Sequence, residues 1–293
     1  MIGNEFAYHR PSSLDELNEV LAGVQGSVSF LAGGTDVVPM LRDDAIAPDV
    51  VIDIKRIPGL GDLRIDDDTL HIGALVTFTE IIESEVVAEH APLLAEMAST
   101  VASPGVRNRA TLVGNICSAV PSCDAGSVLL AYDATIHLAG PGGERTVGID
   151  DWFVGPRKTA RTDDEIATHV TITLRSHAGV YVKLMRYAGE DLAQAAVAIV
   201  ADHEPSYRVA FGALGPTPIR SSRIESLLHG RTIDDDAIND AVAVVSGEIS
   251  PITDIRSTAE YRTHMTEVML ERGLRAAVSR LAGDGPAYGT RLV

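Results

Sequence analysis

Two glycine-containing segments carry residue types suited to holding a phosphate. The first is Ala32-Gly33-Gly34-Thr35-Asp36, which directly follows the apolar run Val28–Leu31. Glycines after a buried strand let the backbone take positive φ and approach a ligand closely, and consecutive N–H groups with the Thr35 hydroxyl can cradle a phosphate. Alone, the segment is equally consistent with a tight turn. It matches neither the GxGxxG nor the GxxxxGK[ST] fingerprint, which disfavours the usual nucleotide-binding folds.

The second segment runs from Thr111 through Gly114 and Asn115 to Pro121 and Asp124. It again combines a glycine with short hydroxyl and amide side chains. Asn115 can donate to a phosphate or accept from a ligand, and Asp124 can accept hydrogen bonds from sugar or ribityl hydroxyls. By itself this is as consistent with a self-satisfied polar loop as with a site. The two segments together favour a phosphate-containing ligand.

Other reactive residue types are not arranged for chemistry. Cys117 and Cys123 lack the further soft ligands that a metal site needs, so we expect two free thiols. The nine histidines show no HxxxH or HExxH spacing. No general base stands in a recognisable arrangement. The sequence therefore predicts no metal site and no catalytic residue in this chain.

Composition narrows the function further. The chain has 293 residues, 45% of them hydrophobic, and 24 basic against 41 acidic residues give a net charge of −17. This composition predicts about two folded domains and disfavours nucleic-acid binding, which needs a basic surface. Apolar runs such as Ala195–Ala201 are far shorter than the ~20 residues of a membrane-spanning helix. Because residues 1–10 show no secretory signal, we expect a cytoplasmic location.

The first half of the chain alternates between helical and strand patterns. Ser13 and Glu16 predict a capping box before an amphipathic helix, and Thr77 and Glu80 predict a second one. Two helices are expected over Phe78–Val101, followed by a polar, irregular segment. The other expected elements are strands at Val28–Leu31, Val50–Ile54, Leu70–Ala74 and Thr135–Ala139, a helix at Ser127–Tyr132, a hairpin turn at Gly140–Gly143 and an exposed loop at Arg157–Asp164.

The order of elements changes after residue 176. Three strand-like runs come in succession and favour an antiparallel sheet, at Val180–Tyr187, Ala195–Ala201 and Tyr207–Leu214. Three helical patterns follow, at Ser222–Leu228, Asp236–Ser246 and Thr258–Leu281. A sheet followed by helices is typical of an α+β domain, so we place a domain boundary near 176.

With these motifs in order, the chain resembles the FAD-binding medium subunits of molybdenum hydroxylases, the family of carbon monoxide dehydrogenase and xanthine dehydrogenase. The resemblance extends from residue 6 to about 280. It rests on Leu31 to Asp36, Val106-Arg107-Asn108, Thr111 to Asn115, Pro121 with Asp124, Lys183-x-x-Arg186 with Asp191, Pro216-x-Pro218-x-Arg220 with Glu225 and Leu228, and Tyr261-Arg262.

The resemblance implies an α+β fold. An FAD-binding domain of the PCMH type would cover 1–176, as two α/β subdomains at about 1–57 and 58–176. A C-terminal domain with a three-stranded antiparallel sheet and helices would cover 177–285, and 286–293 would be a tail. Where the family usually has Thr-x-Gly-Gly-Asn, this chain has Val113, which restricts the backbone there to conformations that a side chain allows.

The resemblance also implies the site. The two glycine segments would clasp the FAD diphosphate, Asp124 would hold ribityl or ribose hydroxyls, and Lys183 would lie near the flavin ring as a stabilising cation. The implied cofactor-binding residues are Ala32, Gly33, Gly34, Thr35, Asp36, Thr111, Gly114, Asn115, Asp124 and Lys183. Tyr187 is expected to be half-buried core, with packing against the flavin as the alternative.

The implied function is electron transfer through FAD. Iron–sulfur clusters of a partner subunit would supply the electrons, and an external acceptor would take them. The molybdenum cofactor and two [2Fe-2S] clusters would belong to a large and a small partner subunit, since two cysteines cannot ligate two clusters; the assembly would be a dimer of heterotrimers. Two alternatives stay open, a stand-alone FAD-dependent oxidoreductase with the same cradle and a scaffold or nucleotide-binding protein that has lost flavin.

Overall fold

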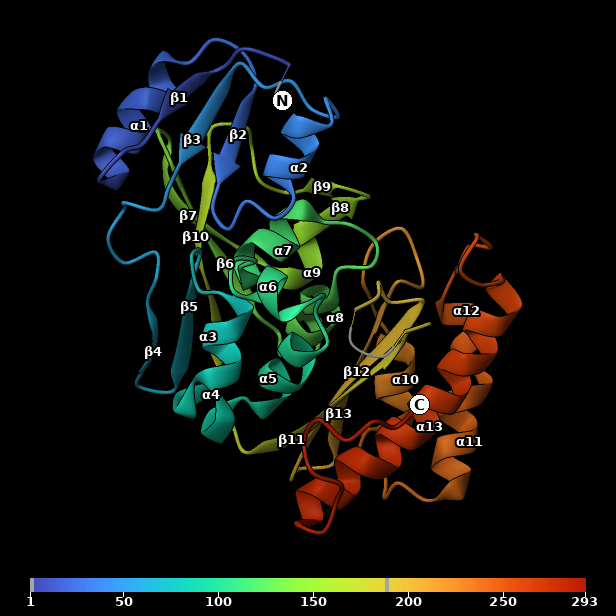
Figure 1. The fold of residues 1–293 in the computed structure, drawn as a ribbon. Helices are drawn as coiled ribbons and strands as arrows, with labels where there is room; N and C mark the ends of the chain where they lie inside the picture. Colours follow the sequence, from blue (N-terminus) through green and yellow to red (C-terminus); the bar gives the residue numbers. More distant parts are fainter. Residues whose placement is uncertain (1–2, 188–189) are drawn as a thin grey trace.

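The first subdomain is a small parallel sheet with two helices. The computed structural model describes residues 3–187 and 190–293, and three main sheets with their helices follow one another along the molecule (Figure 1). The first sheet has the order β1-β3-β2 and confirms both predicted strands. Its elements are β1 (Ala7–His9), α1 (Leu14–Gly23), β2 (Val28–Leu31), α2 (Val37–Arg42) and β3 (Val50–Asp53).

The predicted capping box of α1 forms only in part. The Ser13 hydroxyl accepts a hydrogen bond from the Glu16 N–H at 3.1 Å. The Glu16 carboxylate, however, accepts from the N–H and hydroxyl of Ser12 at 2.7 and 2.8 Å. The Glu16 carboxylate therefore binds Ser12, one residue before the N-cap, and not the backbone N–H of the N-cap residue Ser13. At Thr77 and Glu80 both halves are present, as predicted.

The second subdomain contains a five-stranded antiparallel sheet in the order β4-β5-β10-β6-β7. Helices cover it on the side of the C-terminal domain (Figure 1). The strands are β4 (Leu63–Asp66), β5 (Thr69–Gly73), β6 (Thr135–Gly140), β7 (Gly143–Gly148) and β10 (Ile166–Thr173), with a hairpin of β8 (Phe153–Gly155) and β9 (Lys158–Thr159). The helices are α3 (Phe78–Glu83), α4 (Glu85–His90), α5 (Pro92–Ser99), α6 (Pro104–Arg107), α7 (Leu112–Ser118), α8 (Asp124–Ala131) and α9 (Ile149–Trp152).

Two expectations for this region are wrong. Three helices, not two, span Phe78–Val101, because Ser84 caps α4 through the Val87 N–H and Pro92 begins α5. The segment expected to be polar and irregular contains the end of α6 and the start of α7. Thr111 is the N-cap of α7, and its hydroxyl accepts from the Gly114 N–H at 3.0 Å.

The C-terminal domain is an antiparallel sheet with helices on its outer face (Figure 1). The three predicted strands are confirmed, and a short fourth strand extends the order to β11-β12-β13-β14. Its strands are β11 (His177–Leu184), β12 (Ala195–Asp202), β13 (Ser206–Gly212) and β14 (Ile219–Arg220). Its helices are α10 (Ser222–Leu228), α11 (Asp235–Ala243), α12 (Val245–Glu248) and α13 (Ala259–Ala282), so the helix expected over Asp236–Ser246 is divided in two.

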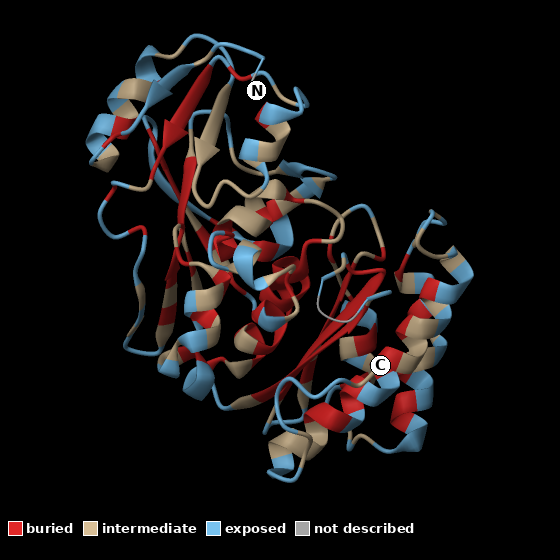
Figure 2. Cartoon of the chain, in the orientation of Figure 1, coloured by how far each residue is buried: buried red, intermediate tan, exposed pale blue. Residues whose placement is uncertain are grey.

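This sheet separates two hydrophobic cores. Ala196, Ala198 and Val200 of β12 belong to the core shared with the FAD-binding half, while Val197 and Ile199 belong to the core under the outer helices. Because side chains alternate across a strand, each face of β12 serves one core. Figure 2 accordingly shows β11, β12 and β13 buried along nearly their whole length.

No helix in the described part of the chain has the length and apolar content to cross a bilayer.

Candidate functional site

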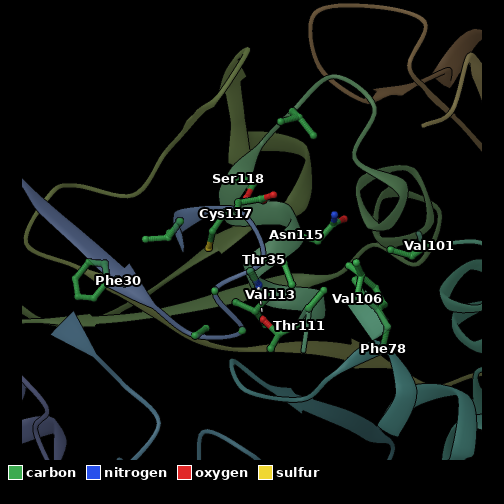
Figure 3. A pocket seen from close by; sticks show the side chains of 18 of the residues that line it. Phe30, Thr35, Phe78, Val101, Val106, Thr111, Val113, Asn115, Cys117 and Ser118 are labelled. Carbon is green, nitrogen blue, oxygen red and sulfur yellow. Dashed lines mark hydrogen bonds between the residues drawn. The ribbon is translucent and has the colours of Figure 1, made fainter. Parts of the chain in front are cut away.

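A cavity of about 760 Å³ brings the two glycine segments together. Its walls come from β2 and the turn after it, from α6 and α7, from the loop after β9, and from residues 190–192 of the C-terminal domain. Figure 3 shows it extending from Phe30, past Thr35 and Val113, to Val101 and Phe78. Nine of the ten cofactor-binding residues implied by the sequence line it: Ala32, Gly33, Gly34, Thr35, Asp36, Thr111, Gly114, Asn115 and Asp124.

The first glycine turn offers free backbone donors. Gly34 has φ +78°, a conformation that favours glycine. A Cβ added at Gly33 would lie 1.9 Å from the backbone oxygen of Arg109, so the turn contacts the second segment too closely for any side chain. Within the described chain, the N–H groups of Gly33, Gly34 and Thr35 donate to no other residue. Three adjacent donors facing a cavity suit a diphosphate.

The second segment enters the cavity as the first turn of α7. Val113 is helical there and buried, so a β-branched residue is accommodated without any glycine-only conformation. The side-chain oxygen of Asn115 accepts from the Ala125 N–H at 3.2 Å and from the Cys123 thiol at 3.0 Å. The amide nitrogen of Asn115 is thereby left to donate to a ligand. Val113 thus does not disturb the geometry of this loop.

Both cysteines are free thiols, as predicted. Burial raises the pKa of Cys117 to about 11 and that of Cys123 further still. Thiols protonated at neutral pH are poor nucleophiles and poor metal ligands. Across the described residues, no group of three or more His, Cys, Asp and Glu side chains is arranged to hold a metal ion.

Asp36 joins the two segments. Its carboxylate accepts a hydrogen bond from the Ser118 hydroxyl at the end of α7. Although Asp36 precedes α2, its side chain makes no capping hydrogen bond to that helix. The carboxylate therefore holds the first turn against α7.

A buried ion pair lies beside the cavity, where the two domains meet. Asp124 lines the cavity, and its two carboxylate oxygens accept from the Tyr181 hydroxyl at 2.7 Å and from the Lys183 ammonium at 3.0 Å. Lys183 also donates to the Thr100 carbonyl at 2.9 Å, and its side chain is only 1% exposed. Lys183 therefore stands behind Asp124 rather than in the cavity wall. Burial raises the pKa of Asp124, against the lowering effect of the Lys183 charge.

The expected burial of Tyr187 is wrong. Strand β11 ends at Leu184, and the Tyr187 side chain lies beyond it at 65% exposure. The Arg186 guanidinium lies 5.4 Å from its ring centre. Tyr187 is not among the residues that line the cavity.

Sequence reasoning missed the opposite end of the cavity. Phe30 of β2 lines it, with the Arg161 guanidinium 5.3 Å from the ring centre, and Arg157 lines it as well. Arg157, Lys158 and residues 162–164 are exposed, as expected for a loop over Arg157–Asp164, while Arg161 is half-buried and residues 158–159 form β9. No local pattern pairs Phe30 with Arg161, because they meet only through the tertiary fold.

The features of the cavity fit a dinucleotide cofactor. Its volume is within the ~300–1,000 Å³ typical of cofactor sites. Figure 3 shows Phe30 at one end of it, the ring over which the Arg161 guanidinium lies, and Thr35 in its middle; the Asp124 carboxylate also lines it.

Comparison with known families agrees with this description. Residues 4–173 match the FAD binding domain in molybdopterin dehydrogenase, and residues 180–277 match the CO dehydrogenase flavoprotein C-terminal domain. The chain belongs to this family, the FAD-binding medium subunits of molybdenum hydroxylases, and FAD is the cofactor that the family implies for its cavity.

Similar proteins carry the same architecture. The chain is 33% identical over 288 residues to the carbon monoxide dehydrogenase medium chain of Hydrogenophaga pseudoflava, covering 96% of this chain and 100% of that one. It is 32% identical to the glyceraldehyde dehydrogenase medium chain of Sulfolobus acidocaldarius, over 92% and 98% of the two chains. A solved structure of the Hydrogenophaga pseudoflava carbon monoxide dehydrogenase superposes with a TM-score of 0.91 at 33% identity, over 96% of this chain and 99% of that chain.

Proposed function

We propose that this chain carries FAD as the electron-transfer subunit of a multi-subunit molybdenum hydroxylase. The observation that carries the proposal is the cavity that both glycine segments line, with the free N–H groups of Gly33, Gly34 and Thr35. The described residues hold no cluster of metal ligands beside it. Relatives are named as medium chains of carbon monoxide and glyceraldehyde dehydrogenases. By analogy, a large subunit holds the molybdenum cofactor and oxidises the substrate.

The residues of this chain bind and orient the cofactor. The N–H groups of Gly33, Gly34 and Thr35 and the amide of Asn115 donate to its diphosphate, and Asp124 accepts from its ribityl hydroxyls. The buried cation of Lys183 acts through Asp124, because its ammonium donates to the Asp124 carboxylate and its charge lowers the pKa of that group against the effect of burial. Bound FAD supplies the capacity to accept electrons from an iron–sulfur partner and to pass them to an external acceptor.

Domain organisation and assembly form part of the same proposal. We divide the chain at about 176, with subdomains at 1–57 and 58–176 and a C-terminal domain at 177–285. A small subunit with two [2Fe-2S] clusters completes each heterotrimer, and two heterotrimers form a cytoplasmic dimer.

Reduction experiments on the chain purified without its partner subunits test this function. Dithionite should bleach its flavin, whereas organic substrates should leave it oxidised. Adding the large and small subunits should restore substrate-dependent reduction of a dye. Substrate turnover by the single chain would instead support a stand-alone flavoenzyme, and a colourless protein that takes up no flavin would support a scaffold.

A further inference from the structure

A buried carboxylate and a lysine lie beside the turn that follows β2. Asp53, the last residue of the neighbouring strand β3, is 3% exposed (Figure 1). Its carboxylate accepts hydrogen bonds from the Tyr8 hydroxyl at 2.7 Å and from the backbone N–H of Lys55 at 3.0 Å. It also pairs with the Lys55 ammonium at 2.8 Å. These contacts keep the Lys55 cation in a fixed position.

Lys55 also contacts the turn itself. The pairing of β2 with β3 ends where the Ile54 N–H donates to the Leu31 carbonyl at 3.3 Å. The next carbonyl, that of Ala32, accepts from Nζ of Lys55 at 3.4 Å. Ala32 lines the cavity, whereas Lys55 is not among the residues that line it. The lysine therefore reaches the turn from outside the cavity.

This contact sets the direction of one peptide group. The peptide between Ala32 and Gly33 is trans, so its carbonyl and its N–H point in opposite directions. Because the carbonyl is held toward Lys55, outside the cavity, the Gly33 N–H is turned toward the cavity. An ammonium that donates to a carbonyl also polarises the peptide group, which makes its N–H a stronger donor.

The opposite orientation of this peptide would work against binding of an anion. A rotated peptide would present the Ala32 oxygen to the cavity, and an oxygen repels a diphosphate. Gly33 and Gly34 follow directly, and the conformational freedom of glycine does little to oppose such a rotation. A cation that holds the carbonyl in place therefore removes the unfavourable orientation.

From these contacts we propose that Lys55, anchored by Asp53, is a positioning residue that orients the first glycine turn for the FAD diphosphate. It acts through the peptide between Ala32 and Gly33 and does not touch the cofactor. This inference rests on the proposed function and adds to it a residue outside the cavity that sets the affinity for the diphosphate.

Binding of three probes to the full-length apoprotein tests this role. FAD and riboflavin are titrated by flavin fluorescence, and ADP is titrated by calorimetry. Lys55→Met keeps the apolar stem but removes the cation, and it should weaken FAD and ADP about tenfold, the size of one charge-assisted hydrogen bond. Riboflavin has no diphosphate, so its affinity should not change. Lys55→Arg keeps a cation with donors for both Asp53 and Ala32 and should restore most of the FAD affinity.

Arg10→Met is the matched control. Arg10 pairs with the same Asp53 carboxylate at 3.4 Å, but among the described residues it has no hydrogen bond to the turn. Arg10→Met and Lys55→Met each remove one cation from Asp53, so both should lower the midpoint of urea unfolding by similar amounts. Only Lys55→Met should weaken FAD binding, which separates positioning of the turn from stability of the fold.

Three results would overturn the role of Lys55. The first is wild-type FAD affinity in Lys55→Met, and the second is an equal loss of FAD affinity in Arg10→Met. The third is an equal loss for riboflavin and FAD, which would show general damage to the cavity. If the wild-type apoprotein binds neither FAD nor riboflavin, the proposed function itself fails, and that outcome is distinct because it appears before any substitution is made.

Discussion

The carboxylate of Glu96 and the guanidinium of Arg280 form a bidentate ion pair that joins the FAD-binding half to the last helix. The two pairs of atoms are 2.7 and 3.1 Å apart, and both side chains are 4% exposed. Arg280 also donates to the Gly179 carbonyl, and Glu96 accepts from the N–H groups of Tyr181 and Gly289. One ion pair thus connects α5, β11, α13 and the C-terminal segment.

Breaking this ion pair should lower the free energy of unfolding of the chain. Arg280→Met leaves the Glu96 carboxylate buried without its cation, a change that costs about 3–5 kcal/mol. Urea unfolding should show the loss as a lower midpoint. Arg291→Met, which removes an exposed arginine near the same terminus, is the control. An unchanged midpoint for Arg280→Met would show that the pair contributes nothing net.

Substitution at Gly34 should abolish FAD binding. Gly34→Val puts a β-branched residue at φ +78°, where its Cβ would lie 3.0 Å from Leu31, and the strained turn would no longer present its N–H groups. Gly143→Val is the matched control, because Gly143 also has positive φ but no atom near its added Cβ. Equilibrium dialysis with FAD should detect binding only in the control. Wild-type affinity in Gly34→Val would show that the turn is not the cradle.

The Asp124 and Lys183 pair should behave as one unit. Burial raises the pKa of Asp124, so its charged form is disfavoured in the fold, and the stability it contributes falls as pH rises through that pKa. Lys183→Met removes the cation that lowers this pKa and leaves the Asp124 carboxylate buried without its partner, so it should cost about 3–5 kcal/mol at neutral pH. Adding Asp124→Asn should restore much of that loss. A double variant whose loss equals the sum of the single losses, measured by denaturant unfolding, contradicts the coupling.

Stacked histidines on neighbouring strands of the five-stranded sheet should make the stability of the fold sensitive to acid. The rings of His137 and His169 stack with centres 4.0 Å apart, and His71 stacks on His169 at 5.6 Å. Burial lowers the pKa of His169 to about 4 and lowers that of His137. The unfolded chain binds these protons more readily, so stability is full above about pH 6.5 and is lost as pH falls toward 4.

His169→Phe keeps a stacked ring without a titratable group. Thermal melts between pH 7 and 5 should show a smaller drop in Tm for this variant than for the wild type. His264→Phe, at an exposed position of α13, should keep the wild-type drop. Equal drops in all three proteins would assign the acid sensitivity to other groups.

Local sequence patterns predicted the helices and strands whose apolar residues follow a clear local pattern. Val28–Leu31 became β2 as expected, because four apolar residues before a double glycine leave few alternatives to a buried strand. The start of α7 was missed because its first turn is marked by the cap Thr111 within a polar segment, where apolar periodicity is weak. Capping chemistry, with the hydroxyl of Thr111 three residues before Gly114, was the signal that could have found it.

The site was predictable only where its residues are close in sequence. The glycine segments could be identified from their own residue types, and resemblance to a family connected them to Asp124. The position of Lys183 behind Asp124, and the pairing of Phe30 with Arg161, depend on strands and loops that are distant in the chain. Those contacts follow from sheet order and domain packing, which single-sequence patterns do not specify.

The flavin content of the purified chain tests the central claim most directly. The chain should be denatured, the supernatant separated from the protein, and the released flavin identified by chromatography. One FAD per chain, fully released, is the expected result, because the cavity offers backbone and amide donors while its cysteine thiol is protonated at neutral pH. Release of FMN, absence of flavin, or flavin retained on the chain would contradict the account.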